Sequence, residues 1–401
     1  MKILLTVEDL RTGGAQTFVL RLAQALHAAG HAVHLYSHYA HHTNEDLVRQ
    51  LAPDVPVIAF GANELADTAL RKADGLRRRL GLTSSWRENR LVRHLRQTIE
   101  RLRPDVVNTH TIKADYAAAK ALRGLGIPLV ITMHGCYELF LHKADAPEVT
   151  PKGNYALRHA AGVVYLTDKN LEIFGQPGVR PLADLAHAKI YNGFDGQFSA
   201  AKAAHTRQKL GIPAGALVAG MVARGIPEKG WQHAIDSFLA LSEEFEQLHL
   251  VLVGESDYLT GLRAQHQHPR LHFTGFSRNP IDWVDLFDVG LLPSYFHAES
   301  LPNSIAEYLS CGKPVIASRI GEVPAMLETD QGLAGVVLDQ AGWQLTNPAQ
   351  LTDALRAYLH DPALLRQHSR LAELAFEKFR MDRCIAAYLE MYQRSEQAQP
   401  V

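Results

Sequence analysis

Short apolar runs alternate along the chain with longer segments in which apolar residues return every three or four positions. Runs bounded by turn residues predict strands, and the periodic segments predict helices. The predicted strands of the first half are 3–7, 32–37, 55–59, 105–109, 129–133, 162–166 and 189–191, and those of the second half are 216–222, 248–253, 271–274, 289–292, 314–317 and 335–338. This alternation is typical of parallel sheets covered by helices, so the predicted fold class is α/β.

The same pattern begins again after turn residues at 192–196, which indicates two domains. A chain of 401 residues with 47% apolar residues is too long for one ordinary core, and this agrees with that division. We predict two doubly wound, Rossmann-like domains facing across a cleft, formed by residues 1–196 and 197–375. The tail consists of successive helical segments, and the last, 376–401, is expected to return to the first domain.

Loops at the carboxyl ends of parallel strands share one edge of a sheet, where such folds bind ligands. Gly13 and Gly14 follow the first strand, and paired glycines let backbone N–H groups approach an anion at the start of a helix. A plain glycine turn is the alternative. Because this turn lacks the GxGxxG pattern, a nicotinamide dehydrogenase is disfavoured.

Two cations, Arg224 and Lys229, follow the first strand of the second domain. A guanidinium can grip two phosphate oxygens while an ammonium supplies a movable charge, so the pair suits a diphosphate. Together they would offset the charge that builds up on a departing phosphate. A solvated surface pair is the alternative.

Two glutamates flank a predicted helix start, where Pro302 is expected at the first helical position. Glu299 then lies in the preceding loop, and Glu307 lies more than a turn inside the helix. Backbone N–H groups around Asn303 and Ser304 would receive a phosphate, and the carboxylates would accept hydrogen bonds from hydroxyl groups on either side of it. A nucleotide sugar has this layout. Two ordinary surface glutamates with a helix cap are the alternative.

These motifs, in this order, resemble the retaining GT-B glycosyltransferases of group 1 type, whose two-glutamate signature E-x7-E matches Glu299 to Glu307. The other matches are the Arg224 and Lys229 pair, NGFD at 192–195, TGF at 274–276, CGKPVIAS at 311–318, the GGA loop at 13–15 and His134 in TMHG. The chain departs from the family at Ser300 and Leu301, which replace the usual Gly-Phe, and at Ala325, where Glu is common. These departures leave the donor sugar open.

The resemblance implies a role for each matched residue. Glu307 would bind the donor ribose, Arg224 and Lys229 the diphosphate, and Glu299 would orient the transferred sugar. In the first domain, on the acceptor side, His134 would contact that sugar. Gly13 and Gly14 would form the loop under the phosphates or the reacting centre.

The implied activity is transfer of a hexosyl-type sugar from a nucleoside-diphosphate donor to an acceptor hydroxyl, with retention of configuration and no metal or other cofactor. The family setting is assembly of bacterial-type cell-surface polysaccharide, lipopolysaccharide or glycolipid, with a carbohydrate or lipid-linked acceptor. A phosphorylase or a nucleotide-sugar epimerase on the same fold is one alternative. A catalytically silent nucleotide-sugar binding protein is another.

The distribution of charge along the chain predicts one basic surface. The net charge is −1, which gives no reason to expect nucleic acid as a partner, yet residues 71–103 hold eleven Lys and Arg against three acidic residues. Leu91, Leu95 and Ile99 follow helical spacing and are expected in the core. The opposite basic face would contact either an anionic membrane surface or only solvent.

The three cysteines, Cys136, Cys311 and Cys384, show no CxxC spacing, so we expect no disulfide framework. No segment approaches the length of a membrane span, and the expected location is the cytoplasm, at most peripheral at the inner face of the membrane. Five histidines crowd residues 31–42 without the spacing of a zinc motif, so metal binding is disfavoured. His110, at another strand end, is a weaker site candidate.

Overall fold

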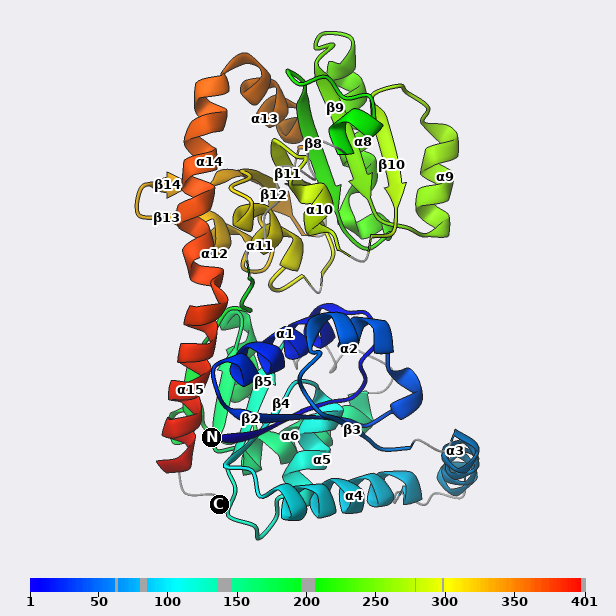
Figure 1. Ribbon diagram of the computed structural model, residues 1–401, viewed down its shortest axis with the longest axis vertical. Coiled ribbons are helices and arrows are strands. Elements are labelled where there is room, and N and C mark those ends of the chain that lie inside the picture. The colour runs from blue at the N-terminus through cyan, green and yellow to red at the C-terminus, as the bar shows by residue number, and fades with distance from the viewer. Residues whose placement is uncertain are drawn as a thin grey trace. The chain divides into compact units, whose positions relative to one another are not determined.

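The computed structural model describes residues 1–61, 64–79, 85–135, 146–195, 206–277, 279–297, 299–342, 344–345 and 347–397. The chain divides into two compact units (Figure 1). The first unit holds Met1–Gly193 together with Met381–Val401, and the second holds Phe194–Arg380. The expected linker after residue 195 and Cys136 lie outside the described residues.

The first unit is built on a parallel sheet of seven strands in the order β3-β2-β1-β4-β5-β6-β7. The strands are β1 (Lys2–Val7), β2 (Ala32–Ser37), β3 (Val57–Ala59), β4 (Val106–Thr109), β5 (Leu129–Met133), β6 (Gly162–Tyr165) and β7 (Ala186–Lys189). Six of them confirm the predicted strands to within two residues at either end. The seventh was expected at 189–191 and was wrong, because this edge strand is only half-buried and its apolar signal is weak.

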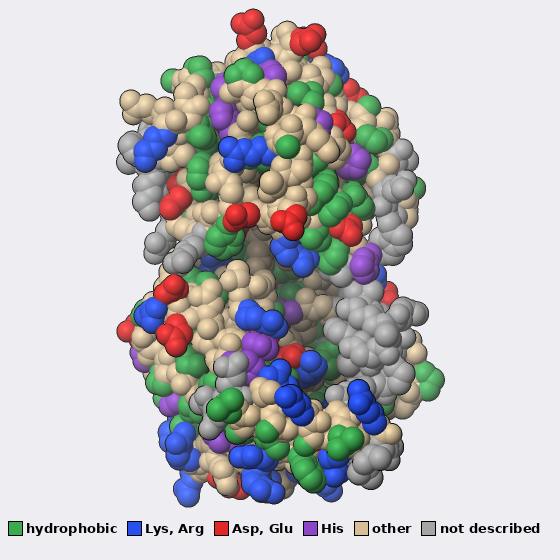
Figure 2. All heavy atoms as spheres, turned by 90° about the vertical axis from the view of Figure 1, so that its right-hand side faces the viewer, with side chains coloured by type: hydrophobic (Ala, Val, Ile, Leu, Met, Phe, Trp, Pro, Cys, Tyr) green, Lys and Arg blue, Asp and Glu red, His purple; other side chains and the backbone are tan. Residues whose placement is uncertain are grey.

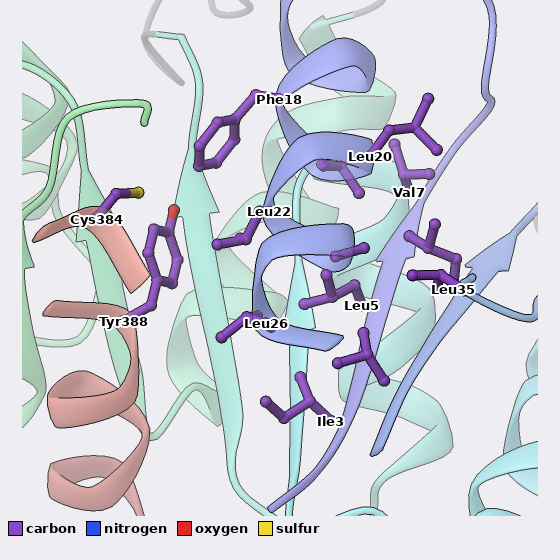
Figure 3. Close-up of a cluster of buried hydrophobic side chains, with 14 of the residues drawn as sticks. Ile3, Leu5, Val7, Phe18, Leu20, Leu22, Leu26, Leu35, Cys384 and Tyr388 are labelled. Atoms are coloured by element: carbon purple, nitrogen blue, oxygen red, sulfur yellow. The ribbon is translucent and has the colours of Figure 1, made fainter. Parts of the chain in front are cut away.

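Helices cover both faces of this sheet: α1 (Gly14–Ala28), α2 (Glu45–Leu51), α3 (Glu64–Arg79), α4 (Trp86–Leu102), α5 (Ile112–Ala121), α6 (Ala146–His159) and α15 (Met381–Gln397). Helices α1 and α15 share one core cluster with β1, where Phe18, Leu22 and Leu26 lie beside Tyr388 and the strand residues (Figure 3). Helices α4, α5 and α6 contribute to the second core cluster of this unit. Leu91, Leu95 and Ile99 of α4 are buried there, as their spacing predicted.

The second unit has a parallel sheet of six strands in the order β10-β9-β8-β11-β12-β15. The strands are β8 (Leu217–Val222), β9 (Leu248–Val253), β10 (Leu271–Gly275), β11 (Val289–Leu292), β12 (Val315–Ser318) and β15 (Gly335–Leu338), and all six confirm the prediction. Two short antiparallel ladders join β13 (Glu328–Thr329) to β14 (Gly332–Leu333) and β16 (Gln340–Ala341) to β17 (Gln344–Leu345). Both units are therefore Rossmann-like α/β domains.

The helices of the second unit are α8 (Trp231–Ser242), α9 (Asp257–Gln265), α10 (Ile281–Val284), α11 (Asn303–Ser310), α12 (Val323–Leu327), α13 (Ala349–His360) and α14 (Pro362–Phe376). A short 3-10 turn, η5 (Pro227–Lys229), precedes α8. Pro302 is the N-cap of α11 rather than its first residue, which corrects the prediction. The reason is its extended backbone, with ψ at 114°, so that helical geometry starts one residue later.

Candidate functional site

In the second unit, the predicted cations and the first glutamate follow two neighbouring strands. Strands β8 and β11 pair in parallel, so the loop with Arg224 and Lys229 and the loop with Glu299 leave the same sheet edge. The Tyr295 amide donates to the Glu228 carbonyl oxygen at 2.8 Å, which joins the two loops. The prediction that Arg224, Lys229 and Glu299 follow strands ending at one edge of the second sheet is therefore confirmed.

Lys229 and Glu299 form a buried ion pair. The Lys229 ammonium donates to Glu299 Oε2, and both side chains are 8% exposed. Ser294 Oγ donates to the same carboxylate oxygen at 3.0 Å. Burial lowers the pKa of Lys229, and the adjacent carboxylate opposes that effect. The pair thus fixes the ammonium at the sheet edge, with its charge balanced by the Glu299 carboxylate.

Phe296 holds the two cations close together, a role that the sequence reasoning missed. The Arg224 guanidinium carbon lies 4.9 Å from the ring centroid, and Lys229 Nζ lies 5.0 Å from it. Cations over an aromatic face are attracted by its negative potential. The only sequence signal was an aromatic residue between a strand end and Glu299. Arg224, Lys229 and Glu299 are thus brought into one cluster around this ring.

Helix α11 carries the other predicted residues of this unit. Asn303 and Ser304 form its first turn, and Glu307 lies one turn further on the same face as Asn303. Tyr308 is fully buried, and its hydroxyl accepts from the Val222 amide at 2.7 Å. This bond ties α11 to the end of β8, so the helix carrying Glu307 is fixed to the strand that leads to Arg224.

Gly321 supports the backbone beside Glu299. Its φ is +53°, and an added Cβ would lie 2.6 Å from the Glu299 carbonyl oxygen and 2.5 Å from that of Ser300. Only glycine fits both the left-handed backbone and this close approach. The Glu322 amide donates to the Ser300 carbonyl at 2.8 Å. The turn after β12 therefore holds Glu299 in place.

In the first unit, Gly13 and Gly14 lie after β1, as predicted. Gly13 is the N-cap of α1, and Gly14 is the first, exposed residue of that helix. A carboxylate orders the loop: Asp9 accepts from Arg11 Nη2 at 2.8 Å and from Gln16 Nε2 at 3.1 Å. These hydrogen bonds to Asp9 thus stabilise the loop that leads into α1.

His134 lies after β5 and is paired with His110, which follows β4. His110 Nδ1 and His134 Nε2 are 2.9 Å apart, and the rings are stacked. Phe18 of α1 contacts both rings edge-on. Burial lowers the pKa of His134 to about 4, and it lowers the pKa of His110 well below the usual value. Both rings are therefore neutral at pH 7. In the hydrogen bond between them, one ring nitrogen donates its N–H and the nitrogen of the other ring accepts it.

In the described part of the chain, no three His, Cys, Asp or Glu side chains are grouped as metal ligands. The crowded histidines do not form one group: His31 Nδ1 contacts the N-terminal amine at 3.1 Å, His38 Nε2 lies 3.2 Å from Thr6 Oγ1, and the rings of His41 and His42 contact each other. Cys311 and Cys384 are free thiols. Among the described helices, none has the length and apolar content needed to cross a membrane.

Two Rossmann-like units, each with loops for a ligand at the carboxyl ends of its strands, place the protein among the doubly wound α/β proteins. Residues 12–181 match the family model Glycosyltransferase Family 4, and residues 216–361 match the model Glycosyl transferases group 1. The chain is a glycosyltransferase of GT-B fold.

Three known proteins illustrate the likeness. The chain is 26% identical over 313 residues to 2-deoxystreptamine glucosyltransferase of Streptomyces kanamyceticus, covering 71% of this chain and 75% of that protein. It is 26% identical over 326 residues to D-inositol 3-phosphate glycosyltransferase of Arthrobacter sp. strain FB24, covering 75% and 73%. The crystal structure of Anabaena HepE with UDP superposes with a TM-score of 0.76 at 23% identity, covering 98% of this chain and 100% of that one. HepE was also solved with UDP-glucose.

Proposed function

We propose that the protein transfers a hexosyl-type sugar from a nucleoside-diphosphate donor to an acceptor hydroxyl with retention of configuration. The observation that carries the proposal is the buried ammonium of Lys229, held with Arg224 around Phe296 at the carboxyl edge of the second sheet. Two adjacent cations suit a leaving diphosphate better than a neutral ligand. UDP and UDP-glucose, which HepE binds, are ligands of this chemistry.

The proposal assigns the donor to the second unit. Arg224 and Lys229 bind the diphosphate, and the first turn of α11, at Asn303 and Ser304, faces its oxygens. Glu307 accepts hydrogen bonds from the ribose. Glu299, which accepts a hydrogen bond from the Lys229 ammonium, exchanges part of that contact for a hydroxyl of the transferred sugar.

The first unit serves the acceptor and the transferred sugar. His134 contacts a hydroxyl of that sugar, and the loop at Gly13 and Gly14 supplies small residues where the reacting groups approach. No metal or other cofactor is needed, because the two cations carry the charge of the leaving group. The setting that we propose is synthesis of cell-surface polysaccharide, lipopolysaccharide or glycolipid, with a carbohydrate or lipid-linked acceptor.

We also propose that the first unit docks peripherally on an anionic membrane in the cytoplasm, through α3 and the start of α4. Leu65, Leu76 and Trp86 are 84%, 59% and 51% exposed there, which is unusual for large apolar side chains. Arg71, Lys72 and Arg79 of α3 are exposed, and Figure 2 shows separate Lys and Arg side chains spread over its lower part. Apolar residues among cations suit a lipid interface. If the protein fails to sediment with anionic vesicles at low salt, docking is excluded.

The test of the main proposal is a thermal-shift panel of UDP, GDP, ADP and their sugars, followed by a transfer assay. A bound donor raises the melting temperature by mass action. We expect release of nucleoside diphosphate only when an acceptor is present. Conversion of donor without acceptor would indicate an epimerase, dependence on inorganic phosphate a phosphorylase, and binding without turnover a silent binding protein.

A further inference from the structure

Ser294 lies where the turn that carries Lys229 meets the loop that carries Glu299. The residue follows β11 by two positions and is fully buried. Its hydroxyl oxygen lies 3.0 Å from Glu299 Oε2 and 3.2 Å from the Glu228 carbonyl oxygen. Since Glu228 directly precedes Lys229, this one side chain reaches both loops of the candidate site.

The heavy atoms of Ser294 are fixed from two sides. Gln340 Nε2, from β16, donates to the Ser294 carbonyl oxygen at 2.6 Å, and the Phe296 amide donates to Ser294 Oγ at 3.3 Å. Close packing around a fully buried side chain leaves the oxygen little room to move. The freedom that remains is rotation of the O–H bond, which decides which acceptor receives the proton.

The hydroxyl proton of Ser294 has two acceptors within reach, and a serine can donate to only one of them at a time. The Glu228 carbonyl oxygen is neutral, and it already accepts from the Tyr295 amide at 2.8 Å. The Glu299 carboxylate is nearer and carries the charge of the ion pair. Because hydrogen bonds to a charged acceptor are the stronger ones, the Ser294 proton lies toward Glu299.

The two donors that hold Glu299 contact the same oxygen of its carboxylate. Lys229 Nζ and Ser294 Oγ both donate to Oε2. Among the described residues no donor reaches Oε1, and the side chain keeps 8% of its surface exposed. Fixing one oxygen of a planar carboxylate also restricts the position of the other. Oε1 is therefore the oxygen that remains for a ligand hydroxyl.

Lys229 cannot be the sole support of Glu299 while it also binds a diphosphate. Its ammonium lies beside Arg224 at the Phe296 ring, where the proposed function places the leaving group. Turning a compact ammonium toward phosphate oxygens weakens its hold on Oε2. Ser294 has no second task of this kind, because its side chain is fully buried.

We propose that Ser294 is a positioning residue, which holds Glu299 by Oε2 so that Oε1 meets a hydroxyl of the transferred sugar. This inference rests on the proposed function. Arg224 and Lys229 bind the diphosphate, which a nucleotide sugar and a free nucleoside diphosphate share. The Ser294 and Glu299 pair adds the contact that only the nucleotide sugar can make.

Calorimetric titration of the full-length protein with UDP, GDP and ADP, each free and as its glucose derivative, tests this assignment. For the nucleotide that binds most tightly, Ser294→Ala should weaken the glucose derivative by about tenfold relative to the free diphosphate, as expected for one hydrogen bond to a charged group. Ser242→Ala is the matched control, since Ser242 is a buried serine of the same unit that donates to the Leu239 carbonyl at 3.0 Å. An unchanged ratio of the two dissociation constants in Ser294→Ala, or an equal change in Ser242→Ala, overturns the inference.

A double-mutant cycle tests whether Ser294 acts through Glu299. Glu299→Gln should itself raise that ratio, and adding Ser294→Ala should then change it by less than about twofold, because the contact that Ser294 supports is already lost. Independent effects of the two changes would mean that Ser294 acts only through the fold, which overturns the inference. Binding of the free diphosphate to Ser294→Ala at the wild-type affinity shows that the variant is folded. A wild type that binds none of the six compounds overturns the proposed function instead.

Discussion

The ammonium of Lys229 donates to the carboxylate of Glu299, and each side chain is 8% exposed. Removing either charge leaves the other buried without its partner. Lys229→Met should therefore destabilise the second unit by about 3–5 kcal/mol, whereas Lys229→Met with Glu299→Leu should recover much of the loss. Urea unfolding of Lys229→Met, Glu299→Leu and the double variant, compared with the wild type, gives a double-mutant cycle. Additive losses would show that the pair is not coupled.

The two cations around Phe296 should matter more for rate than for donor affinity. Arg224→Ala and Lys229→Ala should each lower kcat by roughly 10²–10³, because a lost stabiliser of developing charge costs several kcal/mol in the transition state. Steady-state transfer kinetics measures this. The matched control is Arg263→Ala, which removes an exposed arginine of α9 in the same unit. Activities within a few-fold of wild type would remove Arg224 and Lys229 from the mechanism.

Gly230 is the point where the Lys229 turn touches the Glu299 loop. Its φ is +85°, and an added Cβ would lie 2.1 Å from the Pro293 carbonyl oxygen. Gly275 has a similar φ of +80° but nothing within 4 Å of an added Cβ. Gly275→Ala should cost about 1 kcal/mol from the backbone alone. Gly230→Ala should cost a further 1–3 kcal/mol, roughly, and lower turnover as well. Equal melting temperatures for the two variants would contradict this.

Burial explains which parts of the fold the sequence predicted. Every residue of β5 is buried, and all but Thr132 are apolar, so the sequence marks this strand clearly. The half-buried edge strand β7 is predicted three residues late. Arg224, Lys229 and Glu299 were predicted together because neighbouring parallel strands end at one sheet edge. Their pairing was not predicted, because it depends on which rotamers Phe296 and Ser294 allow.

The contacts of Arg87 with Asp67 and with the ring of Tyr39, which lies beside His41 and His42, could not be predicted for a related reason. The sequence showed crowded histidines and a basic stretch as separate features, and neither the spacing of His41 and His42 nor the helical periodicity around Arg87 connects them. Asp67 and Tyr39 join them only in the folded unit. Hydrogen-bond partners so distant in sequence leave no local pattern.

Acid should weaken the first unit through its buried histidines. Burial lowers the pKa of His38 to about 3 and that of His134 to about 4, from an ordinary value of 6.5. Between about pH 4 and 6.5 the unfolded chain therefore binds more protons than the folded protein, and stability present above pH 6.5 is lost as the pH falls. Each such histidine should contribute a slope of about 1.4 kcal/mol per pH unit.

Urea unfolding from pH 7 to pH 4.5, followed by hydrogen exchange of the β1 and β4 amides, measures that slope. His38→Gln should reduce it by the share of one histidine. His360→Gln, which replaces an exposed histidine of the second unit, should leave it unchanged. A slope that His38→Gln does not alter would mean that the pKa of His38 is not lowered in the folded protein.

The C-terminal helix α15 is tied to the strands that carry His110 and His134. The buried Tyr392 hydroxyl donates to Asn108 Oδ1 at 2.8 Å, and Asn108 Nδ2 donates to Thr132 Oγ1 at 3.0 Å. Asn108 and Thr132 each lie two residues before one of the histidines, on the same face of the sheet. Tyr392→Phe should therefore destabilise the first unit by about 1–3 kcal/mol, because it leaves the amide oxygen buried without a donor.

Tyr388→Phe is the matched control for that change, since the Tyr388 hydroxyl lies 3.3 Å from Thr132 Oγ1, which also accepts from Asn108. We expect a smaller loss of stability from Tyr388→Phe. Hydrogen exchange should report faster opening of β4 and β5 in Tyr392→Phe, with β8 and β11 unchanged, because the bond lies wholly within the first unit. If β8 and β11 exchange faster to the same degree, the helix stabilises the whole chain rather than the strands beneath the histidine pair.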